Sequence, residues 1–161
     1  SINVLALTAQ YAISVGLPED RVKKLCLAAL VHDVGHTLIS KELFEAKDRL
    51  SDEEFQQFQT HSLKGYRAIL KYPEFGKSVA RAVLEHHERL DRSGYPNKIK
   101  EISFEGQVLG LVDCYESLKY HEKNFRDHLA AYDALKIVKE DVVAGKFNKD
   151  MFKDLCSCLI K

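Results

Sequence analysis

Apolar side chains recur every three or four positions through most of this 161-residue chain, and that spacing restricts the chain to helices. In the first stretch, Val4, Leu7 and Tyr11 share one face of a helix, which Gly16 and Pro18 then end. No two segments show the alternating pattern that is typical of paired strands. The sequence therefore predicts an all-α fold.

Start and stop signals divide the chain into about seven helices. Glu19 and Asp20 place acidic residues at the start of the second helix. Ser51 followed by Glu54 has the spacing of a capping box, which opens a long helix that ends before Pro73. The expected helices cover residues 4–13, 19–32, 51–72, 78–90, 104–118, 130–143 and 149–159, with a loop that contains about one turn at 34–45 and a polar loop at 91–102.

The composition narrows the class of protein. A chain of this length with 45% apolar residues suits one domain with its own core. The 24 basic and 24 acidic residues cancel, which argues against a general nucleic-acid or membrane surface. No apolar run approaches the roughly 20 residues that span a bilayer. The four cysteines have no secretory segment beside them, so we expect reduced, mostly buried thiols and a cytoplasmic location.

Two carboxylates stand in strongly apolar surroundings. Asp33 follows the apolar run of residues 27–31, and Asp113 follows the apolar residues 108–112. A charge in such a place needs a partner, which can be a cation, an arginine or a helix cap. For Asp33 alone, a helix end that simply turns into solvent explains the sequence equally well.

Four histidines accompany these carboxylates. His86 continues the apolar stripe of Val79 and Val83, and His87 lies at the edge of the same face. Taken alone, a histidine such as His61 is more often a surface or core residue than a ligand. Together with the carboxylates, however, the histidines indicate one site for two or more transition-metal ions rather than calcium. The expected metal ligands are His32, Asp33, His61, His86, His87 and Asp113.

This donor set suits phosphoester hydrolysis. A carboxylate can bridge two ions, metal coordination lowers the pKa of water to roughly 7, and the ions neutralise phosphate charge. The ligand-bearing stretches are residues 28–35 (Ala-Ala-Leu-Val-His-Asp-Val-Gly), His61, residues 86–89 (His-His-Glu-Arg), residues 91–96 (Asp-Arg-Ser-Gly-Tyr-Pro) and residues 111–115 (Leu-Val-Asp-Cys-Tyr). In their order and spacing they resemble the HD-GYP domains, a bacterial branch of the HD phosphohydrolase superfamily, over nearly the whole chain.

The resemblance implies a helical bundle around a two- or three-metal centre that hydrolyses cyclic di-GMP to pGpG or GMP. Iron or manganese are the expected metals, with zinc or nickel as alternatives. It implies Asp33 as the bridging ligand and the loop Gly94, Tyr95 and Pro96 as the part that shapes the substrate site, with Tyr95 meeting a guanine or a phosphate. Arg126 is similar to a family arginine that contacts the substrate phosphate.

Two positions depart from the family pattern. His36 stands where the family usually has a lysine suited to the scissile phosphate, and a histidine carries full charge only below a pKa of about 6.5. We expect His36 to act in catalysis with Asp33 and Tyr95, by donating a hydrogen bond to the substrate phosphate. Arg92 replaces a glycine, and it would either grip a phosphate or crowd the loop.

These departures keep other functions open. The alternative to a cyclic di-GMP phosphodiesterase is a metal-containing domain that binds the nucleotide or a protein partner and turns over slowly or not at all. Hydrolysis of another nucleotide and a purely structural helical module are further hypotheses.

The chain begins at Ser1, and its only methionine is Met151. We expect residues 1–161 to form one domain excised from a longer protein that has an upstream regulatory or sensory domain. In the family, a metal-binding histidine typically precedes the first helix, and by that alignment it would come directly before Ser1. The oligomeric state is left open.

Overall fold

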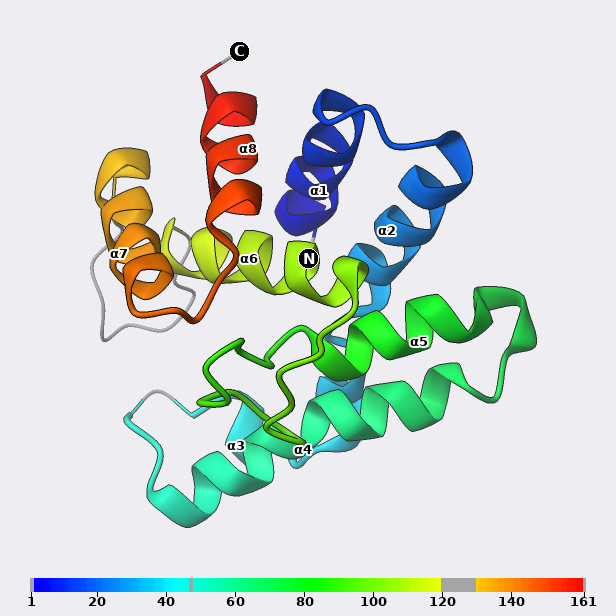
Figure 1. Ribbon diagram of the computed structural model, residues 1–161. Coiled ribbons are helices and arrows are strands. Elements are labelled where there is room, and N and C mark those ends of the chain that lie inside the picture. The colour runs from blue at the N-terminus through cyan, green and yellow to red at the C-terminus, as the bar shows by residue number, and fades with distance from the viewer. Residues whose placement is uncertain (1, 47, 120–129, 161) are drawn as a thin grey trace.

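Eight α-helices and two short 3-10 helices form the regular structure in a computed structural model that describes residues 2–46, 48–119 and 130–160 (Figure 1). Those ranges contain no strand, so the predicted all-α class is confirmed. None of the helices described combines the length and the apolar character that a membrane crossing requires. The elements are α1 (Ile2–Ser14), α2 (Glu19–Val31), η1 (Val34–Leu38), α3 (Lys41–Phe44), α4 (Asp52–Ile69), η2 (Pro73–Phe75), α5 (Gly76–Glu85), α6 (Phe104–Lys119), α7 (Ala131–Val143) and α8 (Lys149–Leu159).

Most helix ends lie where the local signals place them. The capping box is present, since the Ser51 hydroxyl accepts from the backbone N–H of Glu54 and the Glu54 carboxylate accepts from the backbone N–H of Ser51. The side chain of Asn148 caps the start of α8, which covers the predicted residues. The segment at 34–45 was wrongly expected to be mostly loop, because it contains η1 and α3. Ser40 accounts for α3, because its hydroxyl accepts from the backbone N–H of Leu43.

The predicted end of α5 at Leu90 is also wrong, because the helix ends at Glu85. The backbone groups that follow bond to other parts of the chain. The carbonyl of His87 accepts from the backbone N–H of Tyr95 at 3.1 Å, and the N–H of Leu90 donates to the carbonyl of Lys146 at 3.0 Å. His87 and the histidine before it therefore lie at the C-terminal end of α5 rather than along its side.

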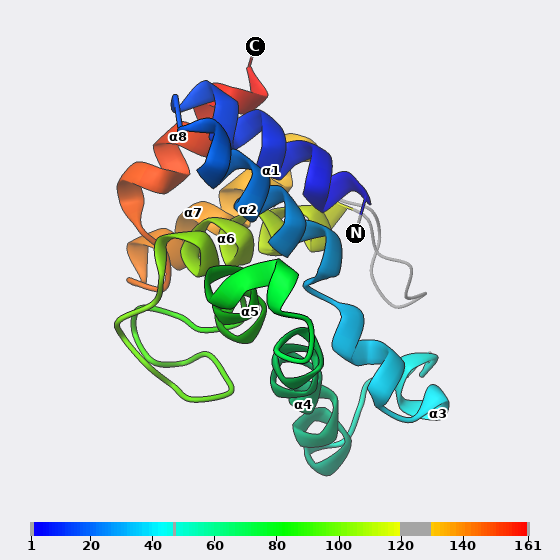
Figure 2. The same ribbon diagram turned by 90° about the vertical axis from the view of Figure 1, so that its right-hand side faces the viewer.

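Helix α6 runs through the centre of the bundle. Its residues 108–112 are all buried, and it packs against α1, α5 and α7. In Figure 1, α8 and α1 lie side by side above α6, α7 lies to its left, α2 lies to its right, and α4 and α5 lie below it. The view in Figure 2 shows α3 projecting beside α4. The end of α2, the middle of α4 and the end of α5 consequently meet below α6.

Direct backbone contact between η1 and α4 brings two of these ends together. A Cβ on Gly35 would overlap the carbonyl oxygen of His61 and lie 2.7 Å from the backbone nitrogen of Gly65. Only a residue without a side chain lets η1 approach α4 this closely. Gly35 therefore sets the distance between Asp33, which precedes it by two residues, and the histidine on α4.

Substituting Gly35 should separate η1 from α4. The new Cβ of Gly35→Ala would meet backbone atoms, which cannot rotate away. We therefore expect the free energy of unfolding to fall by at least about 1–3 kcal/mol. Urea unfolding monitored by circular dichroism measures it.

Gly65→Ala is the matched control for this substitution. Its Cβ would meet the Val83 side chain at 3.1 Å and the backbone nitrogen of Gly35 at 3.3 Å, which is tight but does not overlap a backbone atom. Alanine also gains about 1 kcal/mol of helix propensity over glycine. We expect it to be clearly more stable than Gly35→Ala, and the reverse order would contradict the packing described here.

Candidate metal centre

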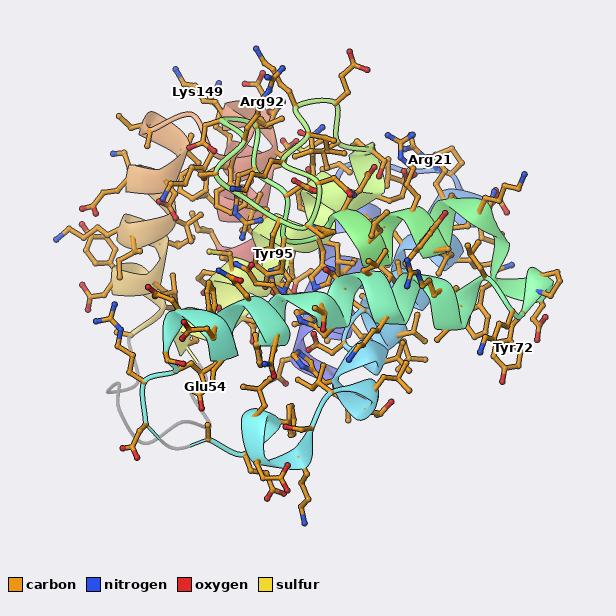
Figure 3. The ribbon with its side chains drawn as sticks, turned by 90° about the horizontal axis from the view of Figure 1, so that it is seen from below. Arg21, Glu54, Tyr72, Arg92, Tyr95 and Lys149 are labelled. Carbon is orange, nitrogen blue, oxygen red and sulfur yellow. The ribbon has the colours of Figure 1, made fainter. Side chains whose placement is uncertain are left out.

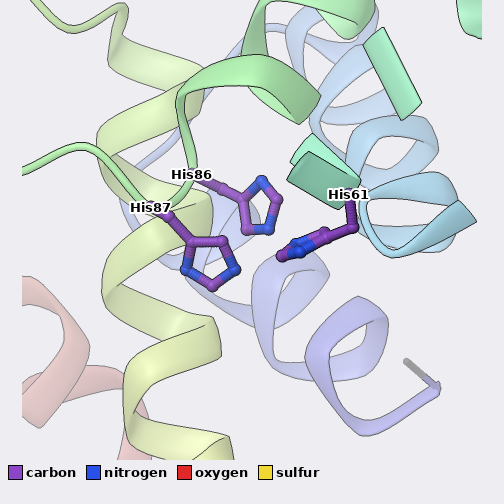
Figure 4. Close-up of side chains that lie close together, drawn as sticks. All are labelled: His61, His86 and His87. Carbon is purple, nitrogen blue, oxygen red and sulfur yellow. The ribbon is translucent and has the colours of Figure 1, made fainter. Parts of the chain in front are cut away.

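Four histidine rings meet where α2, α4 and α5 converge. His32 follows α2, His61 lies on α4, and His86 and His87 follow α5. The ring centroids of His86 and His87 are 4.0 Å apart, and His61 lies 5.0 Å from His87 and 5.6 Å from His86. Figure 4 shows these three rings facing one another. His32 completes the group at 5.3 Å from His86, so histidines distant in sequence form one cluster.

Three of the histidines share one hydrogen-bond arrangement. In each, Nδ1 lies within hydrogen-bond distance of the carbonyl oxygen three residues earlier. A carbonyl oxygen only accepts, so Nδ1 carries the proton in the neutral ring and Nε2 carries the lone pair. The pairs are His32 with Ala29 at 2.8 Å, His61 with Phe58 at 2.8 Å, and His86 with Val83 at 2.7 Å.

The Nε2 atoms of these three rings are buried and have no hydrogen-bond partner among the residues described. Leaving a buried polar atom unpaired costs about 1–3 kcal/mol. Nε2 of His32 has the Asp33 carboxylate 3.0 Å away, but those of His61 and His86 are poorly explained by packing. An imidazole with Nδ1 bonded to a carbonyl and Nε2 unpaired is arranged as a metal ligand. The residues therefore fit divalent metal ions.

Two carboxylates border the histidines. Oδ2 of Asp33 lies 3.0 Å from Nε2 of His32, and Oδ1 lies 3.3 Å from Nε2 of His36 and 4.0 Å from Nε2 of His61. Oδ1 of Asp113 lies 3.5 Å from Nε2 of His32. The two oxygens of Asp33 therefore face different histidines, which is the arrangement that a bridging carboxylate requires.

Burial and these charges move the pKa values in opposite directions. Burial lowers the pKa of His32, but Asp113 and Asp33 outweigh it and raise the pKa to about 10. Burial lowers the pKa of His61 to about 4 and the pKa of His86 to about 3. Without an ion, one imidazolium thus balances the carboxylates, while the other buried rings stay neutral and keep their lone pairs.

Within the described part of the chain, two groups of side chains bring three donor atoms within 4.8 Å of one another. One consists of His61, His86 and His87, and the other of Asp33, His36 and His61. The second group gives His36 a position that we did not expect. Its ring stacks on His61 with centroids 4.0 Å apart, and its side chain is only 13% exposed.

The loop after α5 covers the cluster with Tyr95. The Tyr95 ring stacks on His87 with centroids 4.6 Å apart, and its edge approaches Phe55. Gly94 allows this, because a Cβ there would overlap the carbonyl oxygen of His87 and lie 2.5 Å from the backbone nitrogen of Arg89. The structure thus places Gly94 and Tyr95 beside the histidines, and Pro96 follows directly.

The carboxylate of Glu88 fixes the far side of this loop. The side chain is 3% exposed and accepts from the backbone N–H of Asn97 at 2.6 Å and of Ile99 at 3.2 Å. Sequence reasoning did not single out this residue. A glutamate directly after two candidate ligands was the available signal.

Of the two predicted arginines, the structure describes Arg92 and places it away from the histidines. Arg92 is exposed and lines an open groove with Lys98 and Lys100, and Figure 3 shows it at the edge of the molecule, away from Tyr95. Its backbone is left-handed, with φ at 67°, which explains why glycine suits this position. Arg126 lies outside the described residues.

The sequence of this chain is similar to a known family and to several characterised proteins. A family model described as an HD domain matches residues 2–149. The cyclic di-GMP phosphodiesterase PdeB of Borreliella burgdorferi is 27% identical over 158 residues, covering 95% of this chain and 40% of that protein. The 3'3'-cGAMP-specific phosphodiesterase 1 of Vibrio cholerae is 27% identical over 155 residues, covering 94% of this chain and 35% of that protein. The chain thus spans less than half the length of these relatives.

Among solved structures, Bd1817, an HDG"Y"P protein from Bdellovibrio bacteriovorus, superposes with a TM-score of 0.79 and 20% sequence identity. The superposition covers 99% of this chain and 51% of that one. This similarity shows a shared fold.

Removing His61 should weaken metal binding at both groups, because its single free nitrogen belongs to each. Mn²⁺ at 100 times its Kd should stabilise the unaltered protein by about 2.7 kcal/mol, seen as a rise in Tm. For His61→Ala we expect metal affinity to fall by ~100-fold or more, which removes that rise. Thermal melts against Mn²⁺ concentration, with metal analysis after desalting, measure both effects. Gln56→Ala, an exposed change on the same helix, is the control, and equal uptake by all three proteins would contradict the site.

The left-handed backbone at Arg92 should change the free energy of unfolding when this residue is substituted. That conformation costs a non-glycine residue about 1–2 kcal/mol, and a glycine loses about 0.5–1 kcal/mol through its freer unfolded chain. Arg92→Gly should therefore match the unaltered protein or exceed it by up to ~1 kcal/mol. Arg92→Val, with its β-branched side chain, should be less stable than both in urea unfolding. Equal midpoints for the two variants would show that this backbone carries no strain.

Proposed function

The chain belongs to the HD domain family, and on that premise we propose that it is a metal-dependent phosphodiesterase that hydrolyses cyclic di-GMP to pGpG or GMP. One observation carries the proposal. The buried rings of His61 and His86 have unpaired Nε2 atoms beside Asp33, whose two carboxylate oxygens face the Nε2 atoms of His32 and His36. The relatives named as cyclic di-GMP and cGAMP phosphodiesterases support a cyclic dinucleotide as the substrate.

We propose that the six residues expected from the sequence hold two or more divalent ions, with iron or manganese as the metals. Histidine and carboxylate donors together suit these ions. When bound, they supply the Lewis acidity that lowers the pKa of water to near 7 and that neutralises phosphate charge. The proposed ligands are His32, Asp33, His61, His86, His87 and Asp113.

Aromatic side chains around the cluster suit a substrate with two purine bases. Phe44 is 48% exposed and lies 5.3 Å from His36, while Phe55 is 46% exposed and lies 6.4 Å from Tyr95, measured between ring centroids. Stacking of a base on such a ring contributes about 1–3 kcal/mol. We propose that the guanine bases stack here and that their phosphates lie over the histidines.

Tyr95 is the proposed donor to a substrate phosphate. Burial raises the pKa of its hydroxyl, so the proton stays in place at neutral pH and is available for a hydrogen bond. The stacked His87 ring and the backbone bond from Tyr95 to the His87 carbonyl hold the side chain in position. A donor fixed in advance loses little entropy when the substrate binds.

The second hypothesis, a metal-containing domain that binds the nucleotide without turnover, is favoured by His36. The usual lysine would bring a full positive charge to the scissile phosphate at neutral pH. His36 instead packs against His61 and approaches Asp33. A hydrolysis assay separates the two hypotheses.

We expect the protein loaded with Mn²⁺ or Fe²⁺ to convert cyclic di-GMP to a linear product, with slower conversion of 3'3'-cGAMP and cyclic di-AMP. Asp33→Asn removes the negative charge that faces His32 and His36, so it should lower kcat by at least ~100-fold, which corresponds to several kcal/mol of lost stabilisation. Chromatography of the nucleotides measures the products.

Lys153→Ala, an exposed change on α8, is the matched control and should retain full activity. Calorimetric binding of cyclic di-GMP without any linear product would support the second hypothesis. Neither binding nor product with any of the three nucleotides would contradict both.

A further inference from the structure

We propose that His36 is itself a metal ligand and that it binds an ion together with Asp33 and His61. This inference rests on the metal centre proposed above. It gives His36 a role different from the hydrogen bond to the substrate phosphate that the sequence led us to expect. Nε2 of His36 lies 3.3 Å from Oδ1 of Asp33, and donor atoms of the three residues lie within 4.8 Å of one another.

The surroundings of His36 hold its ring toward these donors. One face stacks on His61 at 4.0 Å and 18°, and the Phe58 and Phe44 rings lie 4.8 Å and 5.3 Å away. The side chain is 13% exposed, and Nδ1 is buried without a hydrogen-bond partner. A residue held in this way is poorly placed to reach out to a substrate phosphate but is well placed to share an ion with Asp33.

The chemistry of the side chain favours the same role. A neutral imidazole has a lone pair for a metal ion, whereas the ammonium group of a lysine has none at neutral pH. A histidine at this position therefore adds a donor to the centre, where a lysine would add a positive charge. The oxygen of Asp33 that faces His36 is not the one that faces His32, so both sides of that carboxylate have an imidazole partner.

The ion at His36 should be the weaker one. In His32, His61 and His86, a hydrogen bond from Nδ1 to a backbone carbonyl orients the ring. A hydrogen-bond partner of this kind behind a metal ligand raises metal affinity by about 10–100-fold. Nδ1 of His36 has no such partner among the described residues. His61 also has a single free nitrogen, which the group with His86 and His87 equally needs. Two classes of metal site with different affinities follow.

The test measures metal binding without nucleotide, so a failure of hydrolysis leaves it readable. The full chain is stripped with a chelator and titrated with Mn²⁺, with free Mn²⁺ followed by electron paramagnetic resonance. We expect His36→Phe, which keeps a ring but has no donor, to weaken the lower-affinity class by ~10–100-fold and to leave the tighter class unchanged. His36→Lys should lose the same class, because it also lacks a lone pair.

Leu38→Ala is the matched control, since it shortens an exposed side chain of the same segment without removing a donor, and it should bind as the unaltered protein does. His36→Leu, which also has no donor atom, serves as a second variant if the larger ring of phenylalanine disturbs the fold. In Co²⁺-loaded protein, loss of the His36 nitrogen should also change the visible absorption bands. Unchanged affinities and spectra in folded His36→Phe or His36→Leu would overturn the proposal, as would equal losses in Leu38→Ala.

Discussion

The site depends on a bond between three of its histidine rings and the backbone of the helix that carries each one. His32 and His86 lie directly after the last residues of α2 and α5, where the final carbonyls lack helical partners. Each ring uses Nδ1 to bond one of these carbonyls, so the same contact caps the helix and turns Nε2 toward the cluster. His61 achieves the same orientation inside α4 through the carbonyl of Phe58. Three helices thus contribute donors whose direction is set by local backbone geometry.

Two buried glutamates near the cluster have full sets of partners, which makes the cluster stand out. Glu85 is 3% exposed and its carboxylate accepts from both the backbone and the side chain of Ser103, and Glu88 is satisfied by the loop. Of the seven buried side-chain atoms without a partner in the described residues, four are imidazole nitrogens of this one cluster. Unpaired atoms that gather at one place, in a protein that satisfies comparable groups elsewhere, are better explained by a ligand than by imperfect packing.

The sequence was sufficient for features that depend on local chemistry. It predicted the helical class, the capping box at Ser51 and the span of α8, and the family match with its phosphodiesterase relatives confirms the HD-GYP resemblance. It could not predict the end of α5, because the bond from Leu90 to Lys146 joins residues that are far apart in the chain. The position of His36 was missed for the same reason, since its stacking on His61 forms only when η1 meets α4. The roles of the individual site residues remain proposals.

The contact at Gly35 links the stability of the fold to the geometry of the metal centre. Asp33 and His36 flank this glycine in one short segment, and His61 lies on the helix against which the segment packs. Any side chain at position 35 would move both Asp33 and His36 away from His61 at once, because η1 is too short to bend between them. The donors of the Asp33, His36 and His61 group are therefore held at their distances by backbone packing rather than by bonds among the side chains. Such a group is positioned before an ion arrives, so metal binding need not be coupled to folding of this part of the chain.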